Sequence, residues 1–131
     1  MSDLRQRLAE LPIERLVSLI SGGGFWTSEA NTDLGIPSFV LTDGPHGLRR
    51  QPADADHLGI GDSVPATCFP TASNLASSWD PAVLTEVGAA LGRESRANGV
   101  GVLLGPGLNI KRHPGCGRSF EYFSEDPLLS G

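Results

Sequence analysis

The chain has 131 residues, of which 39% are hydrophobic and 19% are charged, a balance typical of a soluble globular protein. Its net charge is −5, and its Lys and Arg residues are scattered, whereas a nucleic-acid surface needs a basic stripe. No apolar run approaches the roughly 18–20 residues of a membrane span. We therefore expect neither a nucleic acid nor a membrane as partner, while a neutral small molecule stays compatible with the charge.

The N-terminal segment and the cysteines bear on the compartment. Residues 1–10 are charged and lack the apolar stretch of a secretory signal, which predicts a cytoplasmic location. In that compartment Cys68 and Cys116 are expected to be reduced thiols. The spacing of these cysteines and of His46, His57 and His113 matches no zinc-ligand pattern, so we expect neither a metal nor a cofactor.

The first predicted elements are two helices, over residues 3–10 and 13–20, separated by Pro12. Apolar residues recur at helical spacing in the second. The glycines at 22–24 are predicted to end it by adopting left-handed backbone. Residues 25–37 are interpreted as a loop.

A short apolar run at residues 38–42 predicts a buried strand, whose end leads into Asp43. Residues 49–66 contain prolines and glycines without periodicity, which indicates a long surface loop. Residues 67–72 are interpreted as a second short strand.

The clearest predicted helix has Asp80 as its N-cap, Pro81 in its first turn, and a stop at Asn98 and Gly99. A buried strand over residues 100–104 follows at once, and residues 124–127 resemble another helix start. Strand, helix and strand joined by short connections predict a parallel crossover and an α/β fold. Both a doubly wound sheet and a barrel satisfy this pattern. The sequence ends about one turn into the last helix, so we expect the natural protein to continue.

The first polar cluster spans residues 43–49 and follows the strand over 38–42. Ligands of parallel α/β folds bind at this end of the strands. The carboxylate of Asp43 can accept hydrogen bonds from adjacent sugar hydroxyls, and Arg49 can donate to sugar oxygens or keep Asp43 ionised. The alternative is an ordinary Asp-Gly turn.

The second polar cluster spans residues 109–127 and also follows a predicted strand. Arginines, carboxylates and aromatic residues lie within a few positions of one another. Polar groups on an aromatic floor suit a sugar ring, although an exposed loop of ordinary ion pairs is the alternative. Elsewhere, Trp79 and Phe69 are expected to pack in the core, and Trp26 to be the exposed aromatic residue.

Several blocks, in this order, together resemble the start of family 3 glycoside hydrolases, most of all their bacterial β-glucosidase branch. They lie at residues 36–49, 66–71, 78–80, 104–112 and 117–127. The resemblance implies a (β/α)8 barrel followed by an α/β sandwich domain. Residues 1–131 would then form a partial N-terminal domain, roughly the first third of the barrel.

The resemblance also implies roles for individual residues. Asp43 would bind hydroxyls of the terminal, non-reducing sugar, and Arg49 and Arg118 would line the same subsite. Arg112 and Glu121 would support the site.

The remaining catalytic groups of the family are expected outside this segment: a Lys-His pair, a nucleophilic aspartate and a general acid/base glutamate. This segment alone is therefore expected to be inactive, while the complete protein would hydrolyse terminal β-D-glucosyl residues of small glucosides or oligosaccharides by a retaining mechanism. The resemblance also implies that Cys68 and Cys116 lie close together. The alternatives are a β-xylosidase, a β-N-acetylhexosaminidase, a non-catalytic carbohydrate-binding module and a nucleotide-binding α/β domain.

Overall fold

The structure is a computed structural model that describes residues 2–52 and 61–131. Part of the predicted surface loop, residues 53–60 with His57, lies outside the described residues. The chain divides into two compact units, Met1–Leu41 and Thr42–Gly131. Within the described residues, no helix is both long enough and apolar enough to cross a membrane.

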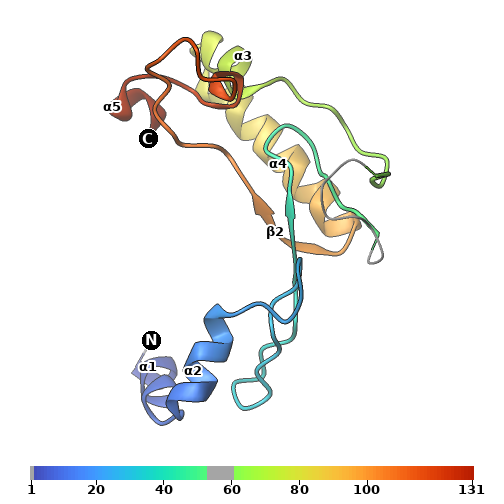
Figure 1. Cartoon of the computed structure of the whole chain (residues 1–131), viewed down its shortest axis with the longest axis vertical. Helices are drawn as coiled ribbons and strands as arrows, with labels where there is room; N and C mark the ends of the chain where they lie inside the picture. The colour runs from blue at the N-terminus through green and yellow to red at the C-terminus, as the bar shows by residue number, and fades with distance from the viewer. Residues whose placement is uncertain (1, 53–60) are drawn as a thin grey trace. The chain divides into compact units, whose positions relative to one another are not determined.

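The first unit begins with helices α1 (Ser2–Ala9) and α2 (Ile13–Ile20), which confirms both predicted helices to within one residue (Figure 1). Pro12 is the N-cap of α2, with extended backbone at φ −63° and ψ 152°. The apolar stripe that identified α2 is largely exposed, since Ile13 retains 65% and Ile20 88% of its accessible surface.

The glycines after α2 act differently from the prediction. The helix ends at Ser21, whose backbone is extended, and none of the three glycines has a positive φ. They are needed because the backbone folds closely on itself. A Cβ on Gly22 would lie 2.8 Å from the carbonyl oxygen of Gly24, and one on Gly23 would lie 2.9 Å from that of Ser28.

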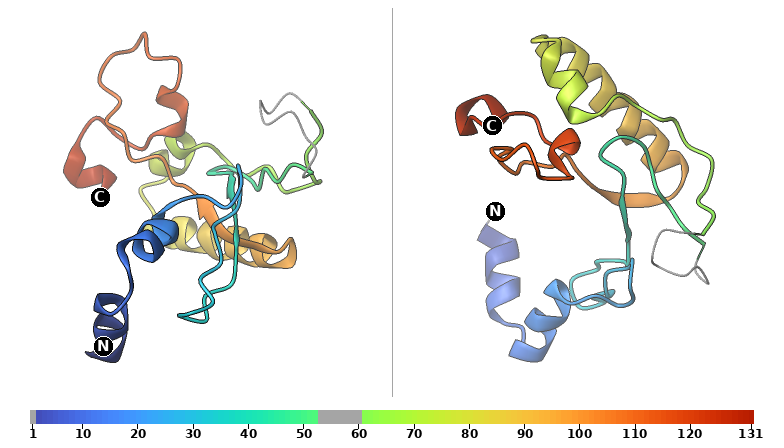
Figure 2. Two further views of the ribbon diagram at one scale, coloured as in Figure 1. Left: turned by 60° about the horizontal axis from the view of Figure 1, so that its bottom comes forward. Right: turned by 45° about the horizontal axis from the view of Figure 1, so that its top comes forward.

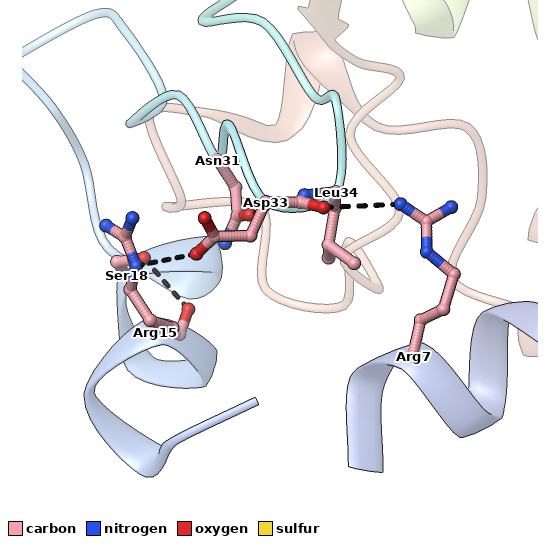
Figure 3. A network of polar contacts seen from close by, with 6 residues as sticks. All are labelled: Arg7, Arg15, Ser18, Asn31, Asp33 and Leu34. Carbon is pink, nitrogen blue, oxygen red and sulfur yellow. Dashed lines mark hydrogen bonds and ion pairs between the residues drawn. The ribbon is translucent and has the colours of Figure 1, made fainter. Parts of the chain in front are cut away.

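Residues 25–37, predicted to be a loop, form no regular element but are held by backbone hydrogen bonds within the segment and to residues 39–41. Asn31 and Ile36 exchange two backbone hydrogen bonds, of 2.8 and 2.9 Å. The buried Asn31 side chain accepts a bond from the Leu34 amide at 3.0 Å. Arg15 pairs with the Asp33 carboxylate at 3.0 Å, and Arg7 donates to the Asp33 carbonyl at 3.3 Å (Figure 3). The side chains of Arg15 and Asp33 are both exposed, so this ion pair contributes at most about 1 kcal/mol.

The second unit carries the α/β part of the chain. Its elements, in order, are β1 (Val40–Asp43, which begins at the end of the first unit), α3 (Ala72–Ser77), α4 (Pro81–Ala97), β2 (Val100–Leu104), the 3-10 turn η1 (Ser119–Glu121) and α5 (Pro127–Ser130). β1 and β2 pair as a two-stranded sheet, and Figure 1 shows both strands pointing the same way. α4 packs on β2. The predicted parallel crossover is confirmed, although β1 starts two residues later than expected.

The predicted strand over residues 67–72 is wrong. That segment is irregular up to Thr71, which is the N-cap of α3. Ala72 and Leu75 are buried on one face of α3, with 2% and 9% of their surface exposed. A helix of six residues offers only one such apolar pair, too little periodicity to distinguish a helix from a short strand.

Two of the three aromatic predictions are also wrong. Trp79 is 77% exposed instead of packed in the core, and its φ of 53° is unusual for a residue with a side chain. Trp26 is half-buried instead of exposed. Phe69 is half-buried and lines a shallow hollow beside α4.

Both ends of α4 follow the prediction. The Asp80 carboxylate accepts a hydrogen bond from the Ala82 amide at 2.9 Å. The helix ends at Asn98, and Gly99 adopts a φ of 67°, the left-handed conformation that glycine favours. α5 begins in the same way, because the Asp126 carboxylate accepts from the amides of Leu128 and Leu129 at 2.7 and 3.3 Å.

Replacing Asp80 by alanine is expected to lower the free energy of unfolding by about 1 kcal/mol, the usual contribution of an aspartate N-cap. Urea unfolding would measure it. Thr85→Ala is the matched control, because the Thr85 hydroxyl bonds back to the Pro81 carbonyl of the same helix and caps no helix end. An equal effect of the two substitutions would contradict a capping role.

Candidate functional site

The loop after β1 doubles back on itself and holds its two charged ends together. The Arg49 amide donates to the Asp43 carbonyl at 2.9 Å, and the buried Thr42 hydroxyl donates to the Arg49 carbonyl at 2.5 Å. Within the loop, the Gly47 amide donates to the Gly44 carbonyl at 3.2 Å. Asp43 and Arg49 therefore lie side by side at the end of β1.

Gly44 and Gly47 make this loop possible. Their φ values are 146° and 145°, a region that residues with a side chain rarely adopt. A Cβ on Gly44 would lie 2.3 Å from the Gly47 carbonyl oxygen, and one on Gly47 would lie 2.3 Å from that of Thr67. Any side chain at either position would force the loop to move.

The loop after β2 approaches the first loop and the 3-10 turn η1. A Cβ on Gly105 would lie 2.9 Å from the Cα of Pro45, and one on Gly107 would lie 2.8 Å from the Tyr122 ring. Gly107 and Tyr122 also form a parallel β-bridge. Three segments remote in the sequence thus meet at the ends of the two strands. In both views of Figure 2 the chain that follows β2 comes close to α3.

Arg118 and Glu121 form a two-pronged ion pair across η1. The Arg118 Nη2 donates to Glu121 Oε2 at 3.0 Å, and its Nε donates to Oε1. The hydrogen bond from Arg118 and then its charge hold the pKa of Glu121 below its usual range, although partial burial opposes this. In the other direction, Glu121 raises the pKa of Arg118, and the charge of Asp43 adds to the increase. Because the carboxyl pKa is lowered, the pair persists above that pKa and is lost as the pH falls through it.

The three segments line an open hollow of about 560 Å³, a volume within the usual range of small-molecule sites. Asp43, Arg49, Arg118 and Glu121 all line it. The structure therefore brings together four of the five predicted site residues. Arg112 is exposed in the loop after β2 and does not line the hollow, so its supporting role stays a prediction.

Sequence reasoning missed other residues that line the hollow, among them His46, Asn109 and Tyr122. The His46 ring lies 6.0 Å from that of Phe120, between centroids. Both of its nitrogens are buried and lack a hydrogen-bond partner among the described residues. The position of His46 inside a glycine-rich motif was the only available signal, and it did not indicate that the ring turns inward.

The cysteines and the remaining candidate metal ligands form no site in the described parts of the chain. Cys68 and Cys116 are both exposed free thiols. Among residues 2–52 and 61–131, no three His, Cys, Asp or Glu side chains lie close enough to hold a metal ion.

A parallel α/β unit with a charged hollow at its strand ends is an arrangement common to many enzymes. Residues 25–131 match the family described as the glycosyl hydrolase family 3 N terminal domain, and the chain belongs to this family. Thermostable β-glucosidase B of Acetivibrio thermocellus is 55% identical over 128 residues, covering 98% of this chain and 17% of that protein. The exo-α-(1→6)-L-arabinopyranosidase of Bifidobacterium longum is 51% identical over 123 residues, covering 93% and 16%.

Solved structures of β-glucosidases match the fold of this chain as well as its sequence. The chain matches the β-glucosidase of Kluyveromyces marxianus in complex with glucose with a TM-score of 0.82 and 40% identity, covering 97% of this chain and 14% of that one. The predicted fold class is confirmed: the chain is α/β and corresponds to part of the N-terminal barrel domain of family 3, as in the β-glucosidases that it resembles. It spans less than a fifth of the length of these relatives.

Proposed function

We propose that this chain supplies part of the sugar-binding subsite of a glycosidase that hydrolyses terminal, non-reducing β-D-glucosyl residues. The observation that carries the proposal is the convergence of Asp43 and Arg118 on one hollow. An acceptor and a cation facing the same space suit a ligand whose hydroxyls both donate and accept hydrogen bonds. The β-glucosidase relatives and the glucose-bound neighbour support a glucosyl group.

In the proposed complex, Asp43 accepts hydrogen bonds from sugar hydroxyls while Arg49 and Arg118 donate to sugar oxygens. Glu121 holds the Arg118 guanidinium in a fixed orientation through its two hydrogen bonds. Contacts of this kind accelerate the reaction when they tighten in the transition state. Asp43, Arg49 and Arg118 would thus bind the sugar and also raise the rate of hydrolysis.

We assign no acid, base or nucleophile to the hollow. The lowered pKa of Glu121 keeps it ionised at neutral pH, so it has no proton to give to a leaving group. A retaining mechanism needs two carboxyl groups about 5–5.5 Å apart, one as nucleophile and one as acid/base. We place both in other parts of the complete protein.

A second specificity has support of its own, because the arabinopyranosidase is nearly as similar to the chain as the β-glucosidase, at 51% against 55% identity. An α-L-arabinopyranoside differs from a β-D-glucoside in the configuration at C4 and in lacking the hydroxymethyl group on C5. This segment does not separate the two specificities by similarity.

The test compares aryl glycosides with the full-length protein. The β-D-glucoside is expected to give the highest kcat/KM, ahead of the α-L-arabinopyranoside, the β-D-xyloside and the β-N-acetylglucosaminide. NMR should detect β-glucose as the first product, and the isolated 131-residue chain should give no turnover. A preference for another glycoside would replace the proposed specificity, and initial release of α-glucose would refute retention. Turnover by the isolated chain would refute our placement of the catalytic carboxyl groups.

A further inference from the structure

The turn that carries the Arg118–Glu121 pair packs against α3 and is hydrogen-bonded to it. The hydroxyl of Ser73, on α3, lies 3.2 Å from the Ser119 carbonyl oxygen and 3.3 Å from the Tyr122 carbonyl oxygen, and donates toward both. Ser119 directly follows Arg118, and Tyr122 directly follows Glu121. A single side chain from α3 therefore reaches both ends of the segment that bears the ion pair.

The Ser73 hydroxyl is itself held by a charged group. Lys111 Nζ donates to Ser73 Oγ at 2.9 Å, and the Lys111 amide donates to the Ser124 carbonyl at 3.2 Å. A hydrogen bond from an ammonium is stronger than one between neutral groups and polarises the hydroxyl that accepts it. Because the oxygen accepts from Lys111, its only hydrogen is directed to the two carbonyls of the turn.

We propose that Ser73, held by Lys111, is a positioning residue for Arg118 in the hollow. Its hydroxyl keeps η1 in place, so the guanidinium stays directed by Glu121 toward the same space as Asp43. The backbone of η1 is closed by two bonds, from the Glu121 amide to the Arg118 carbonyl at 3.1 Å and from the Tyr122 amide to the Ser119 carbonyl at 3.4 Å. The Ser73 hydroxyl adds a tie between this turn and α3. The role in catalysis rests on the proposed function, whereas the fastening of the turn does not.

The first measurement is hydrogen–deuterium exchange over residues 118–124 in the full-length protein. Ser73→Ala should speed exchange there, and Ser73→Thr, which keeps the hydroxyl, should restore the slow rate. Ser77→Ala is the matched control, because the Ser77 hydroxyl lies on the same helix and, among the described residues, bonds to the Ser73 carbonyl and not to η1. Unchanged exchange in Ser73→Ala would overturn the proposal, and this readout is independent of any glycosidase activity.

The second measurement is kcat/KM for the aryl β-glucoside in a double-mutant cycle. Ser73→Ala should lower it about 5–10-fold, the value of roughly one hydrogen bond, while Ser77→Ala should leave it unchanged. In an Arg118→Ala background, Ser73→Ala should cause no further loss, because the hydroxyl then has no guanidinium to position. An equal loss in both backgrounds would assign Ser73 a general structural role and refute the proposal.

Two further outcomes are also decisive. If Ser73→Ala does not fold, Lys111→Met replaces it, keeping the hydroxyl but removing its donor, and should give smaller changes in the same directions. No change in Lys111→Met would then count against the proposal. A folded wild-type protein that hydrolyses none of the glycosides would refute the proposed function, while the exchange data would still decide whether Ser73 fastens the turn.

Discussion

Replacing Asp43 by alanine in the full-length protein is expected to lower kcat/KM for an aryl β-glucoside by about 10²–10⁴-fold. Two hydrogen bonds from sugar hydroxyls to a carboxylate are worth about 1.5–3 kcal/mol each, and each 1.4 kcal/mol is roughly a factor of ten. The folded structure should persist, because Asp43 is exposed and its backbone carbonyl, not its side chain, closes the loop to Arg49.

The matched control for Asp43 is Glu86→Gln, which removes another exposed carboxylate of the same unit. Glu86 lies on α4 and does not line the hollow. Steady-state kinetics should separate the two substitutions by at least about tenfold, while thermal unfolding should not. If Asp43→Ala kept the wild-type kcat/KM, Asp43 would have no part in sugar binding, and the hollow would lose its proposed role.

Replacing Arg118 by lysine is expected to lower kcat/KM about 10–100-fold. Lysine keeps the charge, but an ammonium cannot reproduce the two parallel hydrogen bonds that the guanidinium makes to Glu121. The cation would therefore lose its fixed direction toward the sugar. Arg93→Lys, an exposed arginine on α4 outside the hollow, is the control and should leave kcat/KM unchanged.

The same substitution should also change the pH dependence. Arg118 is the main cause of the lowered pKa of Glu121, so this pKa should rise toward its ordinary range in Arg118→Lys, which loses the guanidinium hydrogen bonds. The pair is present above the pKa of Glu121, so the acid-side loss of kcat/KM should begin at higher pH in the variant. An acid limb at the same pH in both proteins would show that the ion pair has no influence on substrate binding.

The sequence by itself determined the elements whose signals are local. Asp80, Pro81 and Gly99 mark the ends of α4 because a cap, a fixed φ and a left-handed residue act within one turn of the helix. The apolar run over residues 100–104, directly after a helix stop, identified the position of β2. Its predicted burial is wrong, since Val100 is buried but Val102 and Leu104 are 37% and 43% exposed. α3 was missed and the glycines at 22–24 were misinterpreted, because their conformations depend on which neighbours pack against them.

The residues of the site also divide into those that the sequence identified and those that only the structure revealed. The position of two polar clusters after predicted strands indicated where the site lies. The resemblance to family 3 glycoside hydrolases then selected Asp43, Arg49, Arg118 and Glu121 within them. Only the tertiary structure decided that Arg112 lies outside the hollow and that His46 lines it. It also showed that Ser73, which accepts a hydrogen bond from Lys111, is bonded to η1. These relations join segments remote in the chain, and their distances follow from how loops close over the sheet edge, which no local pattern of residues encodes.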